Sequence, residues 1–140
     1  MTEVLGEGGY GPRSVLIRIN GLDTVWGAAD LEAACAAAPD AILVPKVEKP
    51  EDVVQVADLI AAQGAPEHVT IWAMMETPRA MLNAGAIAAA HPRLAGFVLG
   101  TNDLAKDLGA AHTPDRTPLI TGLGLCLLAA RAEGLACVDG

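Results

Sequence analysis

AILVPKVEKPEDVVQVADLIAAQG, residues 41–64, decides the fold class because a strand and a helix follow one another directly in it. Residues 41–47 are almost continuously apolar, which is typical of a strand buried on both faces of a parallel sheet. Pro50 and the two acidic residues after it fit the first turn of a helix, since proline needs no N–H partner there and acidic groups favour the positive end of the helix dipole. Gly64 lies where a left-handed helix cap is expected. The stretch therefore predicts one βα unit.

The same unit recurs along the whole chain. Four further short apolar runs resemble buried strands, namely residues 15–20, 69–75, 96–100 and 135–140. Helical, mostly Ala-rich stretches lie between the runs, at residues 28–38, 50–63, 79–90 and 119–134. Alternation of strand and helix at roughly 25 to 35 residues per unit predicts parallel strands joined by right-handed crossovers. We therefore expect one α/β domain over residues 1–140, either a barrel or an open wound sheet.

The composition narrows the class of protein. The chain has 140 residues, of which 52% are hydrophobic, and a mean hydropathy of +0.38, so it has apolar surface enough for one core. A net charge of −8 argues against broad binding to nucleic acid or to an anionic membrane, which needs clustered Lys and Arg. Neither a signal peptide nor about 18 uninterrupted apolar residues is present. We expect a cytoplasmic protein.

The cysteines do not form a recognisable ligand or disulfide pattern. Cys35, Cys126 and Cys137 are odd in number and lack CxxC or Cys/His spacing. We expect reduced cysteines that pack as small apolar side chains.

Polar side chains gather where the predicted strands end. In LGTNDLAKDLG, residues 99–109, a carboxylate follows a buried strand directly. The other strand ends carry polar residues as well: Arg18 and Asn20, Lys46 and Glu48, Glu76, and Asp139. Both barrels and open wound sheets place their chemistry at the carboxyl ends of parallel strands. The sequence therefore indicates a site at one rim of the sheet.

Each of these residues also has a purely structural explanation. Asp103 alone reads best as a helix N-cap, since its carboxylate would accept free backbone N–H groups. Glu76 could pair with Arg79 three residues on, and Lys46 with Glu48, as exposed contacts of little energy. Arg18, inside an apolar strand, is expected to need a charged partner.

The motifs together resemble a known family. The segments LIRINGLDT, ILVPKVEKPEDV, AMMETPRAMLN, GFVLGTNDLAKDLG and LLAARAEGLACVDG, in this order, are similar to the citrate lyase beta-subunit-like branch of the HpcH/HpaI aldolase superfamily. That branch includes malyl-CoA, citramalyl-CoA and citryl-CoA lyases. The resemblance covers residues 13–140 and implies a TIM barrel and a Mg²⁺-dependent carbon–carbon lyase that cleaves a β-hydroxyacyl-CoA to an acyl-CoA and a keto acid.

The resemblance also implies roles for particular residues. Glu76 and Asp103 match the carboxylates that hold Mg²⁺, and Arg18 matches an arginine that contacts the oxygen-rich part of the substrate. All three are expected to be catalytic and substrate-binding residues. Two carboxylates suit Mg²⁺ because this hard cation prefers oxygen ligands and keeps several waters. Four more residues match supporting positions of the family: Lys46, Glu48, Asn102 and Asp139.

The chain is shorter than the family's barrel. A TIM barrel has eight strands and typically about 250 residues, whereas five strands are predicted here. The sequence thus suggests an incomplete TIM (β/α)8 barrel of about five βα units. Residues 1–12 resemble a helix-to-strand connection from the interior of a longer relative, so we expect an internal start codon and an early stop. Open sheet edges favour an unstable monomer, a homo-oligomer, which is a trimer or hexamer in relatives, or a complementing chain.

Two other functions stay open. One is an inactive remnant or interaction module of the same fold. The other is a pyruvate-dependent 2-keto acid aldolase, although that group usually has GPxDL where this chain has GTNDL at residues 100–104.

Overall fold

The computed structural model describes residues 9–140. The proposed helix-to-strand connection at residues 1–12 therefore lies mostly outside the described residues. The strands are β1 (Leu16–Arg18), β2 (Ala41–Val44), β3 (Thr70–Met75), β4 (Leu94–Leu99) and β5 (Ala136–Asp139). The helices are α2 (Gly27–Ala37), α3 (Pro50–Ala62), α4 (Pro78–Leu82), α5 (Ala84–Ala88), α6 (Thr101–Asp107) and α7 (Ile120–Ala132), the last preceded by the 3₁₀ turn η1 (Thr117–Leu119).

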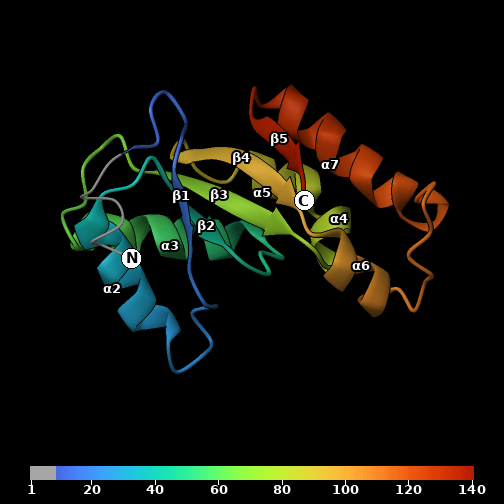
Figure 1. Cartoon of the computed structure of the whole chain (residues 1–140), viewed down its shortest axis with the longest axis horizontal. Coiled ribbons are helices and arrows are strands. Elements are labelled where there is room, and N and C mark those ends of the chain that lie inside the picture. The colour runs from blue at the N-terminus through green and yellow to red at the C-terminus, as the bar shows by residue number, and fades with distance from the viewer. Residues whose placement is uncertain (1–8) are drawn as a thin grey trace.

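The five strands form one parallel sheet in chain order, β1-β2-β3-β4-β5. Figure 1 shows the strands crossing the middle of the molecule, with α2 and α7 at opposite ends. Because each crossover adds a strand at the same edge, right-handed connections place their helices on the same face of the sheet. The prediction of an α/β chain with five parallel strands is confirmed, and β5 is the last described element.

Sequence signals located some helix ends better than others. Pro50 opens α3, and Gly64 follows it with φ +68°, as predicted. The prediction of a single helix over residues 79–90 is wrong, because α4 and α5 are separate helices that meet at Asn83. That residue has φ −98° and ψ 5°, and its side-chain amide donates to the Glu48 carbonyl oxygen at 2.7 Å.

The core lies between the sheet and the helices. On the helix-facing side, Ile42, Ile71, Ala73, Met75 and Phe97 are each 0% exposed. These side chains alternate along the strands with less buried neighbours, because successive residues of a strand point to opposite faces. In β3 and β4, burial is therefore deeper on the helix-facing side than on the other face, whereas β2 is buried on both faces.

The opposite face carries the residues that would point into a barrel. Trp72, Met74 and Val98 are half-buried there, and Val138 is 46% exposed. The Trp72 ring lies over Gly96, where an added Cβ would come within 2.8 Å of ring carbons. The sheet is therefore a wall with one covered face and one partly open face, and within residues 9–140 β1 and β5 each pair on one side only.

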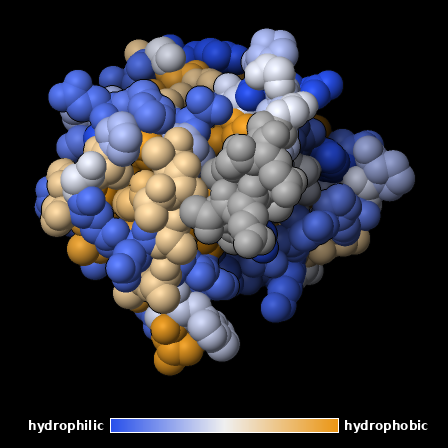
Figure 2. Space-filling model, turned by 60° about the vertical axis from the view of Figure 1, so that its left-hand side comes forward, coloured by the Kyte–Doolittle hydropathy of each residue, from blue (hydrophilic) through white to orange (hydrophobic). Residues whose placement is uncertain are grey.

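The surface is mixed in character. Figure 2, which turns the α2 side forward, shows a pale apolar band bordered by hydrophilic surface. Within residues 9–140, no helix combines the length and apolarity needed to cross a membrane. All three cysteines are free; Cys35 and Cys126 are buried in the core, and Cys137 is half-buried.

Candidate functional site

Glu76 directly follows β3, in a position that fixes its carboxylate. The residue is 6% exposed although its side chain is charged. Its Oε1 accepts the backbone N–H of Lys46 at 2.9 Å. Gly100, at the end of neighbouring β4, lies so close that an added Cβ would be 2.6 Å from Glu76 Cβ and 2.9 Å from Oε2. The absence of a side chain at Gly100 therefore makes room for this carboxylate.

The surroundings of Glu76 perturb its proton equilibrium. Burial raises the pKa of Glu76 above its usual range, and the hydrogen bond from the Lys46 N–H opposes that rise. The charge of Asp103 raises the pKa further, whereas the charges of Lys46 and Arg18 lower it. Four charged groups from four segments of the chain therefore share one electrostatic environment, which is typical of functional sites.

Asp103 reaches the site from the first turn of α6. This helix begins at Thr101 after Gly100, so Asp103 is its third residue. The interpretation of Asp103 as a helix N-cap is therefore wrong, because Gly100 is the N-cap and the helix starts three residues earlier than the sequence suggested. Its carboxylate is half-buried, which leaves it accessible for another partner.

Lys46 connects the two carboxylates. Its N–H bonds Glu76, and its Nζ lies 3.7 Å from Asp103 Oδ2. The expected pair between Lys46 and Glu48 is absent among the described residues, whose ion pairs are Lys46 with Asp103 and Arg116 with Asp139. Glu76, which follows β3, and Asp103, which follows β4, therefore lie on the same side of the rim, with Lys46 between them.

Arg18 lies near this group without pairing. It ends β1 and is exposed, and the register sets it beside Leu43 on the open face. The expectation that Arg18 needs a charged partner is wrong for the part of the chain described, because the side chain is solvated rather than enclosed. Its charge nevertheless lowers the pKa of Glu76. Arg18 is thus available to an anion brought to the open face.

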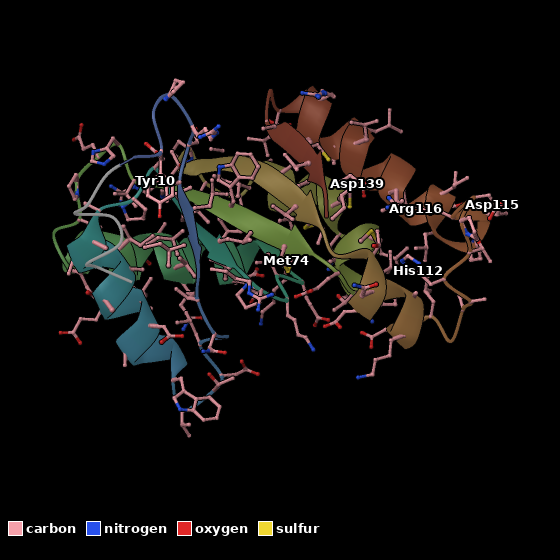
Figure 3. All side chains as sticks on the ribbon, viewed as in Figure 1. Tyr10, Met74, His112, Asp115, Arg116 and Asp139 are labelled. Atoms are coloured by element: carbon pink, nitrogen blue, oxygen red, sulfur yellow. The ribbon has the colours of Figure 1, made fainter. Side chains whose placement is uncertain are left out.

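Asp139 has a different environment. Arg116 Nη1 donates to Asp139 Oδ1 at 2.6 Å and also bonds Oδ2. In Figure 3, Arg116 lies between Asp139 and Asp115, at the α7 end of the molecule. The register pairs Asp139 with Leu99, a buried residue of the helix-facing side, so the structure does not bring Asp139 to Glu76.

The remaining expected residues lie around the rim. Asn102 is exposed on α6. Glu48 acts through its backbone, because its N–H bonds Asp52 Oδ2 at 2.8 Å and its carbonyl accepts from Asn83. Arg79 is exposed and makes no ion pair with Glu76 within residues 9–140. A cavity of about 650 Å³ adjoins the site through Lys46 and continues to Asp52 and Arg79.

The donor set fits Mg²⁺ in part. Glu76 and Asp103 provide two carboxylates, the ligand type that this hard cation prefers. Within residues 9–140 no three His, Cys, Asp or Glu side chains come together as a metal-binding group. The pair therefore suits Mg²⁺, which binds through one or two carboxylates with waters and substrate oxygens, better than Zn²⁺, which takes three or four protein ligands.

The backbone of Lys46 is the part of the site that the sequence did not reveal. Lys46 has φ +50°, the left-handed region that costs a non-glycine residue about 1–2 kcal/mol. This conformation accompanies the N–H bond to Glu76. Nothing in VPKVE distinguishes a left-handed lysine from an extended one, because the compensating contact comes from a residue 30 positions away.

Comparison with known proteins identifies the family. The sequence profile of the HpcH/HpaI aldolase/citrate lyase family matches residues 8–140. A (3S)-malyl-CoA thioesterase of Cereibacter sphaeroides is 57% identical over 131 residues, which cover 94% of this chain and 44% of that protein. A malyl-CoA/beta-methylmalyl-CoA/citramalyl-CoA lyase of Chloroflexus aurantiacus is 35% identical over 118 residues, which cover 79% of this chain and 34% of that one.

Solved structures give the same result for the fold. The citrate lyase beta subunit of Mycobacterium tuberculosis, complexed with oxaloacetate and magnesium, superposes with a TM-score of 0.73 at 30% identity, covering 89% of this chain and 53% of that one. The chain spans about half the length of the relatives it matches, and its five-stranded wall superposes on part of their fold. The chain belongs to the HpcH/HpaI aldolase/citrate lyase family.

Proposed function

We propose that the chain carries the cation-binding and anion-binding wall of a Mg²⁺-dependent carbon–carbon lyase acting on a β-hydroxyacyl-CoA of the malyl-CoA, citramalyl-CoA or citryl-CoA type. The observation that carries this proposal is the convergence of Glu76 and Asp103 on Lys46 at one rim, where Glu76 is buried and held. Family membership supports the substrate class, because relatives are CoA-ester enzymes.

Glu76, Asp103 and Arg18 would have separate roles in this reaction. A bound Mg²⁺ would supply Lewis-acid charge to the oxygens of the hydroxy acid. Glu76 and Asp103 would hold the cation, and Glu76 is oriented in advance by the Lys46 N–H and by Gly100. Arg18 offers a planar set of donors that fits a carboxylate in two hydrogen bonds. The product of this reaction is a keto acid together with an acyl-CoA.

The whole activity needs more of the barrel than this wall. The chain matches 44% of the Cereibacter sphaeroides relative. We propose that further strands, in a homo-oligomer or from a complementing chain, cover the open face that carries Trp72 and Met74. They would also supply contacts to the CoA moiety, because acyl-CoA substrates are far larger than the rim formed here.

A second candidate is thioester hydrolysis. The relative at 57% identity is a (3S)-malyl-CoA thioesterase, and this likeness favours hydrolysis of malyl-CoA as the alternative outcome at the same site. In hydrolysis water adds to the thioester carbonyl and the CoA thiol leaves, which gives malate and free CoA. In lyase cleavage the bond between the hydroxyl-bearing carbon and the adjacent CH₂ breaks, which gives glyoxylate and acetyl-CoA.

The test has a binding arm and a product arm. Mg²⁺ is titrated calorimetrically into wild type and into the double variant Glu76→Gln, Asp103→Asn, and we expect heat only with wild type. Equal, negligible heats in both would remove the metal proposal. Malyl-CoA is then supplied with Mg²⁺, and glyoxylate, malate and free thiol are measured. Glyoxylate indicates the lyase, free thiol with malate indicates the thioesterase, and neither product would show that the chain alone is inactive.

A further inference from the structure

Lys46 makes two contacts at the rim through two different groups, its backbone N–H and its side-chain ammonium. Its backbone N–H contacts Glu76 at 2.9 Å, and its ammonium lies 3.7 Å from Asp103. Its φ of +50° is unfavourable for lysine. Residues in this region persist only where surrounding contacts over-determine them, and they cluster at functional sites.

We propose that Lys46 is a positioning residue for the cation site, whose backbone fixes Glu76 while its ammonium occupies Asp103 until a divalent cation displaces it. The proposal rests on the proposed cation site and adds a role for a residue that is itself no ligand. The same lysine then both prepares the site and lowers its affinity, because the ammonium competes with the cation for one carboxylate.

The exposure of the Lys46–Asp103 pair limits how strongly the ammonium can compete with Mg²⁺ for the Asp103 carboxylate. The side chains of Lys46 and Asp103 are 64% and 44% exposed, so solvent screens their attraction. An exposed pair contributes at most about 1 kcal/mol, which corresponds to about a fivefold change in a dissociation constant. Removing the ammonium should therefore tighten Mg²⁺ binding by up to about fivefold, and less at high salt.

The backbone function can be separated from the charge by the choice of substitution. Lys46→Met removes the charge and keeps an unbranched side chain. Lys46→Gly removes the charge and adopts positive φ without strain, so it keeps the N–H on Glu76. Lys46→Val removes the charge and, being β-branched, disfavours positive φ. The control is Lys49→Met, which removes one charge from an exposed rim lysine outside the ion pairs of residues 9–140.

The binding experiment is Mg²⁺ titration of these variants at low and high salt. We expect Lys46→Met and Lys46→Gly to bind Mg²⁺ up to about fivefold more tightly than wild type, with Lys49→Met unchanged. Lys46→Val should bind about tenfold more weakly than Lys46→Met, because Glu76 loses a charge-assisted hydrogen bond. Unchanged or weaker binding by Lys46→Met, or equal binding by Lys46→Val, would overturn the proposal.

A second measurement needs no metal. In the metal-free chain, Glu76→Gln should move the Lys46 amide resonance upfield, since a neutral amide is a weaker acceptor than a carboxylate. Asp52→Asn is the matched control, because Asp52 accepts the N–H groups of Glu48 and Lys49 instead, and it should leave the Lys46 amide in place. An unmoved Lys46 amide in Glu76→Gln refutes the backbone function. Absence of Mg²⁺ binding by wild type refutes the proposed cation site and the competition, while this resonance still decides the backbone function.

Discussion

Gly100→Ala offers a direct test of how Glu76 is held. The new Cβ would lie 2.6 Å from Glu76 Cβ and 2.9 Å from Oε2, whereas ordinary contacts start at 3.4 Å. Glu76 or the end of β4 must therefore move by about 0.8 Å, a shift comparable with the overpacking that costs about 1–3 kcal/mol. Gly100 has φ −85°, which alanine adopts readily, so the loss comes from the steric contact.

The assay is urea unfolding monitored by circular dichroism, combined with Mg²⁺ titration. We expect Gly100→Ala to lower the free energy of unfolding by about 1–3 kcal/mol and to weaken Mg²⁺ binding. Gly124→Ala is the control, because Gly124 lies within α7 and an added Cβ meets nothing within 4 Å. It should stabilise the chain by about 0.5–1 kcal/mol. Wild-type stability and Mg²⁺ affinity in Gly100→Ala would refute the close packing of Gly100 on Glu76.

Three further predictions concern titratable groups. Hydrogen bonds from Thr113 and Thr117 lower the pKa of Asp115 to about 2, so its carboxyl carbon should titrate near pH 2 by NMR, and a midpoint near 4 would contradict those bonds. Burial raises the pKa of Cys126 to about 12, so this thiol should react with a disulfide reagent only after unfolding, and rapid labelling of the folded chain would disprove its burial. Since burial raises the pKa of Glu76, the folded chain holds this proton more tightly than the unfolded one, and the resulting stabilisation is lost as pH rises through the raised value. Glu76→Gln should therefore gain stability relative to wild type as pH rises above 4.5, the ordinary pKa of a glutamate, in urea unfolding, and an unchanged difference would argue against a raised pKa.

Local signals were enough to predict the βα units. In residues 41–64, apolar continuity, Pro50 and Gly64 each act within a few residues, so strand, helix and cap followed from the sequence. The break at Asn83 did not, because it accompanies a hydrogen bond to Glu48, 35 residues away. Long-range contacts of this kind leave no periodic pattern in the sequence.

The candidate site divides in the same way. Glu76, Asp103 and Arg18 were selected by motif, and the structure gathers their charges at one rim. The prediction that Lys46 pairs with Glu48 is wrong. The backbone of Lys46 is left-handed, and its ammonium lies beside Asp103 instead. Asp139 was selected by its strand-end position and by its match to a supporting position of the family, but the pleat of β5 directs it to Arg116.

The strict chain order of the sheet has a consequence for how the protein forms. Each new strand pairs with the strand synthesised just before it, so no strand has to wait for a distant partner. Each pairing therefore closes a single βα crossover, so the entropy of loop closure is lost one unit at a time. A nascent chain leaving the ribosome can therefore extend this wall strand by strand, as each βα unit emerges and docks on its predecessor.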